Sequence, residues 1–255
     1  MQNYFSRVNL LLGGDMFKRL QRIKVIIFGL GGVGSWCAES LVRSGVCHIT
    51  LVDSDRVDVT NINRQLPATS STVGQVKVDV MKNRLMDINP DAEIMAIRRF
   101  YTEETADEFD LSQYDYVIDA IDSLKDKALL ILRATNSGAK LFSSMGAALK
   151  VDAGKISVAE FWKVQGCPLA AALRRKFKRS GQFPKRKFKC VYSPELFRNR
   201  GTQPEKAELN GNIDVNNLDS VDMNAIKAQI NGTIAHTTAI FGFRLAGLVI
   251  EDLLL

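Results

Sequence analysis

Cysteine and histidine are scarce in this chain of 255 residues, which has four of the first and two of the second. Cys37, Cys47, Cys167 and Cys190 show no C-x-x-C spacing, so they cannot supply the paired ligands of a structural zinc site. The two histidines are far apart in the sequence, and we expect neither to bind a metal. Unpaired cysteines of this kind are typical of reduced thiols in the cytoplasm.

Long apolar runs are also missing, although 46% of the residues are hydrophobic. The segment from Ile234 to Leu255 is apolar, but Arg244, Glu251 and Asp252 interrupt it. A membrane-spanning helix needs about 20 consecutive apolar residues, so this segment predicts a core or dimer-interface helix over about residues 233–255. We expect no signal peptide, because the N-terminus has no charged stretch that leads into a long apolar run. Together these features predict a soluble, cytoplasmic protein that does not enter a membrane.

Acidic residues are missing from one long stretch, Phe161 to Pro194, in a chain of net charge +6. Its basic residues number ten: Lys163, Arg174, Arg175, Lys176, Lys178, Arg179, Lys185, Arg186, Lys187 and Lys189. A block of one sign repels itself, so it favours a partner that supplies phosphates. The interleaved Phe177, Phe183, Phe188 and Tyr192 could stack on unpaired bases of an RNA loop. A solvated surface and an anionic membrane surface are the alternatives.

The stretch from Val25 to Asp53 organises the rest of the chain. The apolar run Val25 to Phe28 predicts a buried parallel strand, and Gly29-Leu30-Gly31-Gly32-Val33-Gly34 follows it as a match to G-x-G-x-x-G. Residues 35–44 have a helical pattern, and residues 48–53 predict a second strand that ends in the acid Asp53. Glycines let the backbone approach a phosphate at a helix N-terminus, and the acid is placed for a ribose hydroxyl. The stretch therefore predicts a nucleotide-binding βαβ unit.

The flanking segments are less specific. Met1 to Arg22 predicts a helical segment, and residues 54–65 are too polar for a strand. Apolar positions from Val76 to Ile88 predict a helix that Asn89-Pro90 ends. Lys77 falls in the first turn of that helix, where the dipole favours anions. A bound phosphate would explain this lysine, and a solvated side chain is the simpler alternative.

Five sequence blocks occur together, in order and at fixed spacing. They are Gly29-x-Gly31-Gly32-x-Gly34-Ser35, Val52-Asp53-x-Asp55, Asn61-x-Asn63-Arg64-Gln65, Gly74-x-x-Lys77, and a buried strand over residues 115–123 that ends in an aspartate. In combination they resemble the E1-like, ThiF-type adenylating superfamily. The resemblance implies an α/β, Rossmann-like fold with a mostly parallel sheet flanked by helices and a C-terminal extension. It implies a single domain over residues 1–255, with the nucleotide-binding half at about 1–150.

The second half of the chain favours one branch of that superfamily. Activators of ubiquitin-like sulfur carriers usually have two C-x-x-C pairs, which this chain lacks. Residues 118–123, 155–158, 168–170 and 190–193 instead resemble the tRNA threonylcarbamoyladenosine dehydratases, and the likeness is patchier between 200 and 230. That family uses ATP to convert N6-threonylcarbamoyladenosine at tRNA position 37 to its cyclic form. The threonyl carboxylate attacks the α-phosphate, and the urea group of the same nucleoside then attacks the acyl-adenylate.

The resemblance also implies roles for single residues. The phosphate turn is Gly29, Gly31, Gly32 and Gly34, the ribose acid is Asp53, and the triphosphate ligands are Asn61, Arg64 and Lys77. Asp122 would hold Mg²⁺, Asp55 and Ser123 would complete the nucleotide site, and Arg7 would reach across a homodimer to the ATP of the partner. The basic segment at about 161–200 would contact tRNA through Arg174, Arg175, Lys176, Lys178, Arg179, Lys185, Arg186, Lys187 and Lys189.

Cys190 lies where the family has a cysteine after the basic block. We expect a structural thiol there rather than a nucleophile, although Lys187 and Lys189 would lower its pKa. A sulfur-transfer protein is a further candidate partner by resemblance.

Three other functions stay open. An activator of a sulfur carrier would share the first step, but the missing zinc cysteines and the basic block count against it. A nicotinamide-dependent oxidoreductase would use the same glycines and would leave Asn61, Arg64 and Lys77 without a role. A catalytically silent tRNA-binding module would have no reason to keep Arg64, Lys77 and Asp122 together.

Overall fold

Two short helices precede the first strand in the computed structural model, which describes residues 4–201 and 231–255. Helix α1 spans Ser6–Leu12 and helix α2 spans Gly14–Arg22. The sequence predicts one helical segment here, but Gly13 adopts a φ of 80° and divides it. Helix α2 then buries Leu20 in the core and ends at Arg22, two residues before the sheet begins.

Seven strands form one sheet in the order β3-β2-β1-β4-β5-β7-β6. They are β1 (Lys24–Phe28), β2 (His48–Val52), β3 (Glu93–Ile97), β4 (Tyr116–Asp119), β5 (Lys140–Ser144), β6 (Ser157–Glu160) and β7 (Lys189–Tyr192). All neighbouring pairs are parallel except β6 and β7. The chain builds outward from β1 to β3 and then crosses to β4 on the other side of β1. This reversal makes the ends of β1 and β4 the switch point where ligands bind in open α/β sheets.

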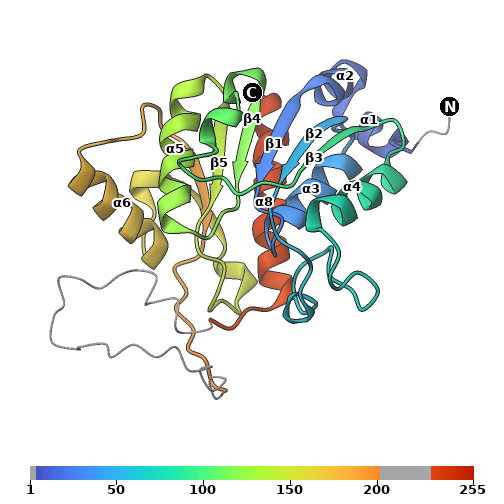
Figure 1. The fold of residues 1–255 in the computed structure, drawn as a ribbon. Helices are drawn as coiled ribbons and strands as arrows, with labels where there is room; N and C mark the ends of the chain where they lie inside the picture. The colour runs from blue at the N-terminus through green and yellow to red at the C-terminus, as the bar shows by residue number, and fades with distance from the viewer. Residues whose placement is uncertain (1–3, 202–230) are drawn as a thin grey trace, which may run out of the picture.

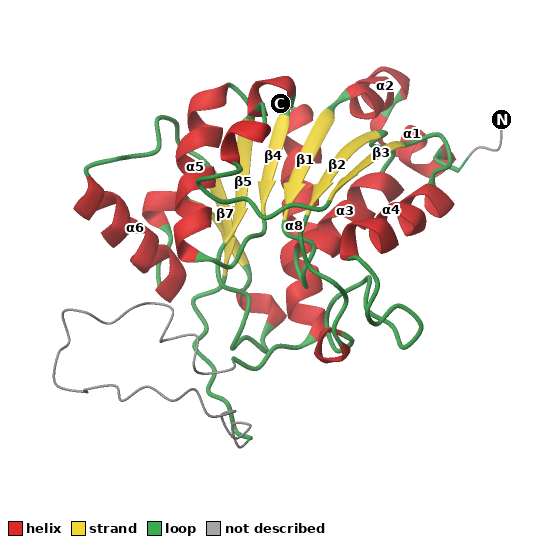
Figure 2. Ribbon diagram, viewed as in Figure 1, coloured by secondary structure: helices red, strands yellow, loops and turns green. Residues whose placement is uncertain are grey.

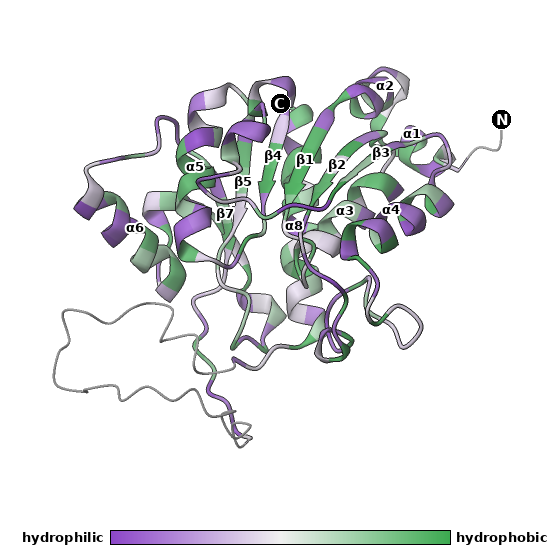
Figure 3. Ribbon diagram, viewed as in Figure 1, coloured by the Kyte–Doolittle hydropathy of each residue, from purple (hydrophilic) through white to green (hydrophobic). Residues whose placement is uncertain are grey.

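Helices cover both faces of the sheet (Figures 1 and 2). They are α3 (Gly34–Arg43), α4 (Lys77–Ile88), α5 (Leu124–Ser137), α6 (Pro168–Ser180) and α8 (Ala235–Leu253). Val25 and Ile27 of β1 pack with α3, α4 and α8, whereas Ile26 and Phe28 pack with α5 and α6. Successive side chains of a strand point to opposite faces, so a strand covered on both sides is apolar throughout. The hydropathy colouring agrees, with apolar strands between helices that carry polar outer surfaces (Figure 3).

The main elements agree with the sequence predictions. The first two strands and the helix between them lie within a residue of the predicted bounds, and α4 ends where Asn89-Pro90 requires. The C-terminal segment is a helix that buries Phe241, Leu245 and Val249 in the core. No helix within residues 4–201 or 231–255 is long and apolar enough to cross a membrane.

One predicted boundary is wrong, because the strand expected over residues 115–123 stops early. Strand β4 ends at Asp119, so Asp122 lies in the loop beyond it rather than at the strand end. The single domain over residues 1–255 stays a prediction, and most of the patchy part of the resemblance, 200–230, lies outside the described residues.

Candidate nucleotide-binding site

The glycine turn joins β1 to α3 and lies against the end of β4. Gly29 has a φ of +88°, and a Cβ atom there would lie 2.7 Å from the carbonyl oxygen of Ala120. A Cβ at Gly34 would overlap the carbonyl oxygen of Gly29. Only glycine fits these two positions, and the turn therefore brings the N-terminus of α3 to the switch point between β1 and β4.

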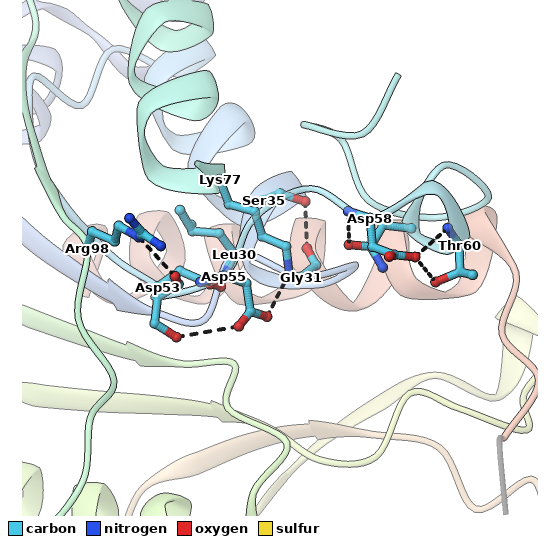
Figure 4. A network of polar contacts seen from close by, with 11 residues as sticks. Leu30, Gly31, Ser35, Asp53, Asp55, Asp58, Thr60, Lys77 and Arg98 are labelled. Atoms are coloured by element: carbon cyan, nitrogen blue, oxygen red, sulfur yellow. Dashed lines mark hydrogen bonds and ion pairs between the residues drawn. The ribbon is translucent and has the colours of Figure 1, made fainter. Parts of the chain in front are cut away.

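Asp53 follows the last residue of β2 and is bonded to the glycine turn. One of its carboxylate oxygens accepts a hydrogen bond from the backbone of Leu30 at 2.6 Å, and the other accepts from the backbone of Asp55 at 2.9 Å (Figure 4). Ser35 closes the other side of the turn, since its hydroxyl donates to the Gly31 carbonyl at 2.6 Å. A carboxylate has lone pairs for about four bonds, so Asp53 can still accept from ribose hydroxyls.

Lys77 begins α4 and lies almost fully buried beside Asp55. Its ammonium group is 2.9 Å from the Asp55 carboxylate, and its side chain is 6% exposed against 54% for Asp55. The backbone of Lys77 also donates to the carbonyl of Asp55 at 3.0 Å (the pair is labelled in Figure 4). The alternative of a solvated lysine is therefore wrong. A buried cation whose partner faces solvent is suited to hold a phosphate in place of that partner.

Arg64 and Asn61 come from the loop after β2, which is built around the short 3₁₀ helix Val59–Asn61. Asn61 is buried and its side-chain oxygen accepts from the backbone of Asp58, so this side chain holds the loop. Arg64 donates to the carbonyl of Thr60 at 3.0 Å and to the side chain of Asn63 at 2.9 Å. Burial lowers the pKa of Arg64, and the nearby charge of Asp122 opposes this.

Asp122 and Ser123 lie in the loop between β4 and α5. Asp122 is exposed, and Ser123 is the residue before the first turn of α5. The charge of Asp122 opposes the lowering of the Arg64 pKa, so the loops after β2 and β4 carry opposite charges that interact. The described residues contain no group of three or more acidic, histidine or cysteine side chains that could bind a metal on their own.

Sequence reasoning missed a buried charged network directly beneath this loop. Asp119 and Lys127 are both fully buried and form an ion pair at 2.9 Å. Asp119 also accepts hydrogen bonds from the Ser143 hydroxyl at 2.6 Å and from the Ile121 backbone at 3.1 Å. Lys127 donates a hydrogen bond to the Ile121 carbonyl at 2.8 Å. An aspartate inside an apolar strand was the available signal, because such a residue needs a partner. The network fixes the backbone that leads to Asp122.

Arg98 is a second residue that the sequence did not single out. It follows β3 and donates to the Ser54 carbonyl at 3.3 Å, which places another cation near Asp53 (Figure 4). Arg7, by contrast, is exposed on α1, and its side chain forms no hydrogen bond or ion pair with the described part of its own chain.

Two members of the basic block serve the fold. Arg174 donates to the carbonyls of Phe161 and Val164, at 3.2 and 2.9 Å. Arg186 donates to four carbonyls at the end of α5, those of Ala134, Thr135, Gly138 and Ala139. Both guanidinium groups therefore hold carbonyls of their own chain, and Arg186 is exposed as well, so a role of these two residues in tRNA binding stays a prediction. The other eight basic residues are exposed and form no ion pair with residues 4–201 or 231–255.

The aromatic residues of the block are also divided. Phe177 and Phe188 are buried in the core and cannot stack on a base, whereas Phe183 is exposed. Cys190 is fully buried, and burial raises its pKa well above the usual value. The expected lowering by Lys187 and Lys189 is therefore wrong, because neither contributes and the opposing cation is Lys127. A structural role for this thiol agrees with its position.

The glycine turn lies at the switch point of a parallel sheet, an acid follows β2, and cations lie in the loop after β2 and at the start of α4. This arrangement defines a nucleotide-binding α/β protein. The model of the ThiF family matches residues 5–253. The chain is 46% identical to the tRNA threonylcarbamoyladenosine dehydratase of Bacillus subtilis, over 71% of each chain. It is 37% identical to that of Haemophilus influenzae, over 98% of this chain and 93% of the relative.

Solved structures give the same result. The crystal structure of the Escherichia coli tRNA N6-threonylcarbamoyladenosine dehydratase in complex with ATP has a TM-score of 0.82 and 30% identity. The match covers 99% of this chain and 94% of that one. The chain therefore belongs to the ThiF family, within its branch of tRNA threonylcarbamoyladenosine dehydratases.

The buried network gives a stability prediction. Lys127→Met should lower the free energy of unfolding by about 3–5 kcal/mol, because it leaves the Asp119 charge buried without its partner. Lys125→Met is the matched control, since Lys125 lies on the same helix and forms only an exposed ion pair. Adding Asp119→Asn to Lys127→Met should restore part of the loss, because both charges are then removed. Urea unfolding followed by circular dichroism measures all three, and equal midpoints for the two lysine variants would contradict the network.

Proposed function

We propose that this protein is an ATP-dependent enzyme that dehydrates N6-threonylcarbamoyladenosine at position 37 of tRNA to its cyclic form. The threonyl carboxylate displaces pyrophosphate from ATP to give a carboxyl-adenylate. The urea group of the same nucleoside then displaces AMP, so water is lost overall. The observation that carries the proposal is the buried Lys77 beside the glycine turn, in a chain 37% identical to a dehydratase over nearly its whole length.

The residues of the site fit a nucleoside triphosphate. The glycine turn leaves space for a phosphate at the N-terminus of α3, and Asp53 has free lone pairs for ribose. Lys77 and Arg64 offer two cations beyond what a dinucleotide pyrophosphate needs. Carboxylate is already an adequate nucleophile, so these groups would act by positioning and by neutralising charge rather than as a general base.

Mg²⁺ is proposed at Asp122. A magnesium ion is commonly bound by one or two carboxylates together with substrate phosphates, so an exposed single aspartate beside Arg64 fits such a site. When bound, the ion would supply positive charge that stabilises the reacting phosphate. Asp119 does not fit this role, since its carboxylate is bonded to Lys127 and Ser143.

The chemistry needs no thioester. Cys37, Cys167 and Cys190 are buried, and Cys47 is half-buried, which raises the pKa of its thiol. A sulfur-carrier activator is the second candidate. The Thermus thermophilus sulfur carrier protein adenylyltransferase is 36% identical, but over only 47% of this chain and 44% of that protein. A sulfur-transfer protein as accessory partner, and action in the cytoplasm, stay predictions from the resemblance.

Pyrophosphate exchange into ATP tests the proposed reaction. Exchange should require tRNA that carries threonylcarbamoyladenosine, because its carboxylate is the nucleophile, and should fail with unmodified tRNA or without RNA. Lys77→Ala should weaken ATP binding roughly tenfold to a hundredfold, as expected for the loss of a charged hydrogen bond. Asp122→Ala should lower turnover more than ATP affinity. Lys82→Ala, on the same helix as Lys77, is the control.

Two results would overturn this reading. Exchange stimulated by a carrier protein but not by modified tRNA would favour the sulfur-carrier activator. Tight binding of NAD in a direct titration would favour a dinucleotide site.

A homodimer with Arg7 at the partner's ATP is also proposed. Leu10 and Leu11 lie on α1 beside Arg7 and are 87% and 82% exposed, which suits an interface. Arg7→Ala and Arg64→Ala chains should each be nearly inactive, but a statistical mixture should recover about a quarter of the activity, because one site of each heterodimer is intact. No recovery in a mixture shown to contain heterodimer would exclude an action of Arg7 across the dimer.

Binding of tRNA through the exposed cations of α6 is the last part of the proposal. Changing Arg175, Lys176, Lys178 and Arg179 to glutamine should weaken tRNA binding. The slope of log affinity against log salt concentration should become shallower by up to about 3, since fewer counterions are released for each phosphate contact that is lost. ATP affinity should not change. Arg174 is left intact because it holds the Phe161 carbonyl. Glutamine at Lys18, Lys24, Lys125 and Lys155 is the charge-matched control, and an unchanged slope in the α6 variant would assign the RNA to another surface.

A further inference from the structure

Phe161 is the buried centre of an aromatic cluster that joins the basic segment to the sheet. Its ring stacks on Phe188 at a centroid distance of 5.0 Å and meets Phe177 of α6 edge-on at 5.8 Å. The Arg174 guanidinium lies over the same ring at 5.9 Å. These contacts fix α6 and the segment that returns to β7 in one rigid arrangement around Phe161.

Trp162 and Phe183 form the outer layer of this cluster. Trp162 packs edge-on against Phe161 at 5.2 Å, and its ring lies 6.1 Å from that of Phe183. Trp162 is 40% exposed and Phe183 is 51% exposed. The two rings, called here the aromatic pair, are therefore held from beneath by the core and left open above.

The chain segments that carry the aromatic pair contain charges of one sign, since residues 161–194 include no acid. Lys163 is the next residue after Trp162, and the exposed Lys178 and Arg179 end the helix that leads to Phe183. None of these cations has an acidic partner in the described part of the chain. The nearest acid in sequence, Glu160, is partly buried and accepts from the Trp162 backbone at 3.1 Å, so it caps the turn.

The aromatic pair lies at the opposite edge of the sheet from the nucleotide site. The backbone N–H of Phe161 donates a hydrogen bond to the carbonyl of Phe188, which lies just before β7. Strand β7 runs parallel to β5, so it begins at the end of the sheet that is opposite to the glycine turn. Figure 1 shows α6 at the outside of the molecule, beyond β5 and β7 and away from α3 and α4. A group bound there is therefore distinct from the nucleoside that reacts.

We propose that Trp162 and Phe183 form a stacking platform for an unpaired base of the bound tRNA, other than the modified adenosine. The inference rests on the proposed function, because it takes tRNA as the substrate. Exposed aromatic rings beside a basic surface are the recurring arrangement by which proteins hold single-stranded nucleic acid, where the ring faces stack on bases and the cations follow the phosphates. An acidic peptide would satisfy the cations but would leave the two ring faces without a matching partner.

The test separates stacking from charge. Trp162→Ala and Phe183→Ala should each weaken binding of full-length tRNA by between about fivefold and a hundredfold, the range measured for single stacked bases. The slope of affinity against salt should not change, because no phosphate contact is lost. Trp162→Phe keeps a ring and should retain most of the affinity. Phe100→Ala is the control, since Phe100 is an exposed ring that follows β3.

Tryptophan fluorescence gives an independent readout. Stacking on a base should quench Trp162, so tRNA should quench the native chain more than the Trp162→Phe chain, whose only tryptophan is Trp36. Thermal unfolding of each variant checks its fold, and Phe183→Ala keeps the test valid if Trp162→Ala is unstable.

Each outcome decides the proposal. Unchanged tRNA affinity in both alanine variants, or equal quenching with and without Trp162, would overturn the platform while the proposed function stands. If polyglutamate displaced the RNA and quenched Trp162 as strongly as tRNA does, the platform would also be overturned. The surface would then be assigned to an acidic protein. No binding of tRNA by any chain would instead refute the proposed function.

Discussion

The close approach of the glycine turn to the end of β4 is the constraint on which the site depends. Gly29 and Gly34 allow the backbone to lie against Ala120, where any side chain would collide. This contact brings the loop after β4, with Asp122, to the N-terminus of α3. The Asp119–Lys127 pair holds the same loop from below. Two features thus fix the position of this loop. The glycines leave room for the backbone to approach it, and the buried ion pair holds it from beneath.

The nucleotide-binding half could be predicted from sequence because its signals are local. An apolar run, a glycine pattern and an acid at a set distance determine β1, α3 and β2 within a residue of their bounds. The end of β4 could not be predicted in the same way. Residues 115–123 are apolar enough for a longer strand, and only the capture of Asp119 by Lys127 and Ser143 shows why the chain turns there. Those partners come from α5 and β5, so the reason is tertiary.

The basic block shows the limit of composition as a guide to function. Ten cations in a run predict a charged surface, yet Arg186 is used to bond the last carbonyls of α5 and Arg174 to hold the turn at Phe161. A guanidinium has five donors in a planar fork, so it can satisfy several carbonyls at once, which a lysine cannot. The remaining lysines and arginines keep the surface charge. Sequence alone does not distinguish these two uses, because Arg174 and Arg186 each have a basic residue as a direct neighbour, like the exposed cations of the block.

The reversed strand β6 has a consequence for the whole molecule. If β6 ran parallel to β7, the chain would leave the sheet at the same strand ends as the nucleotide site, and Trp162 would lie beside that site. Because it runs the other way, Trp162 emerges at the far edge and α6 returns along the side of the sheet. A single change of chain direction therefore puts the full length of the parallel strands between the glycine turn and the exposed aromatic pair.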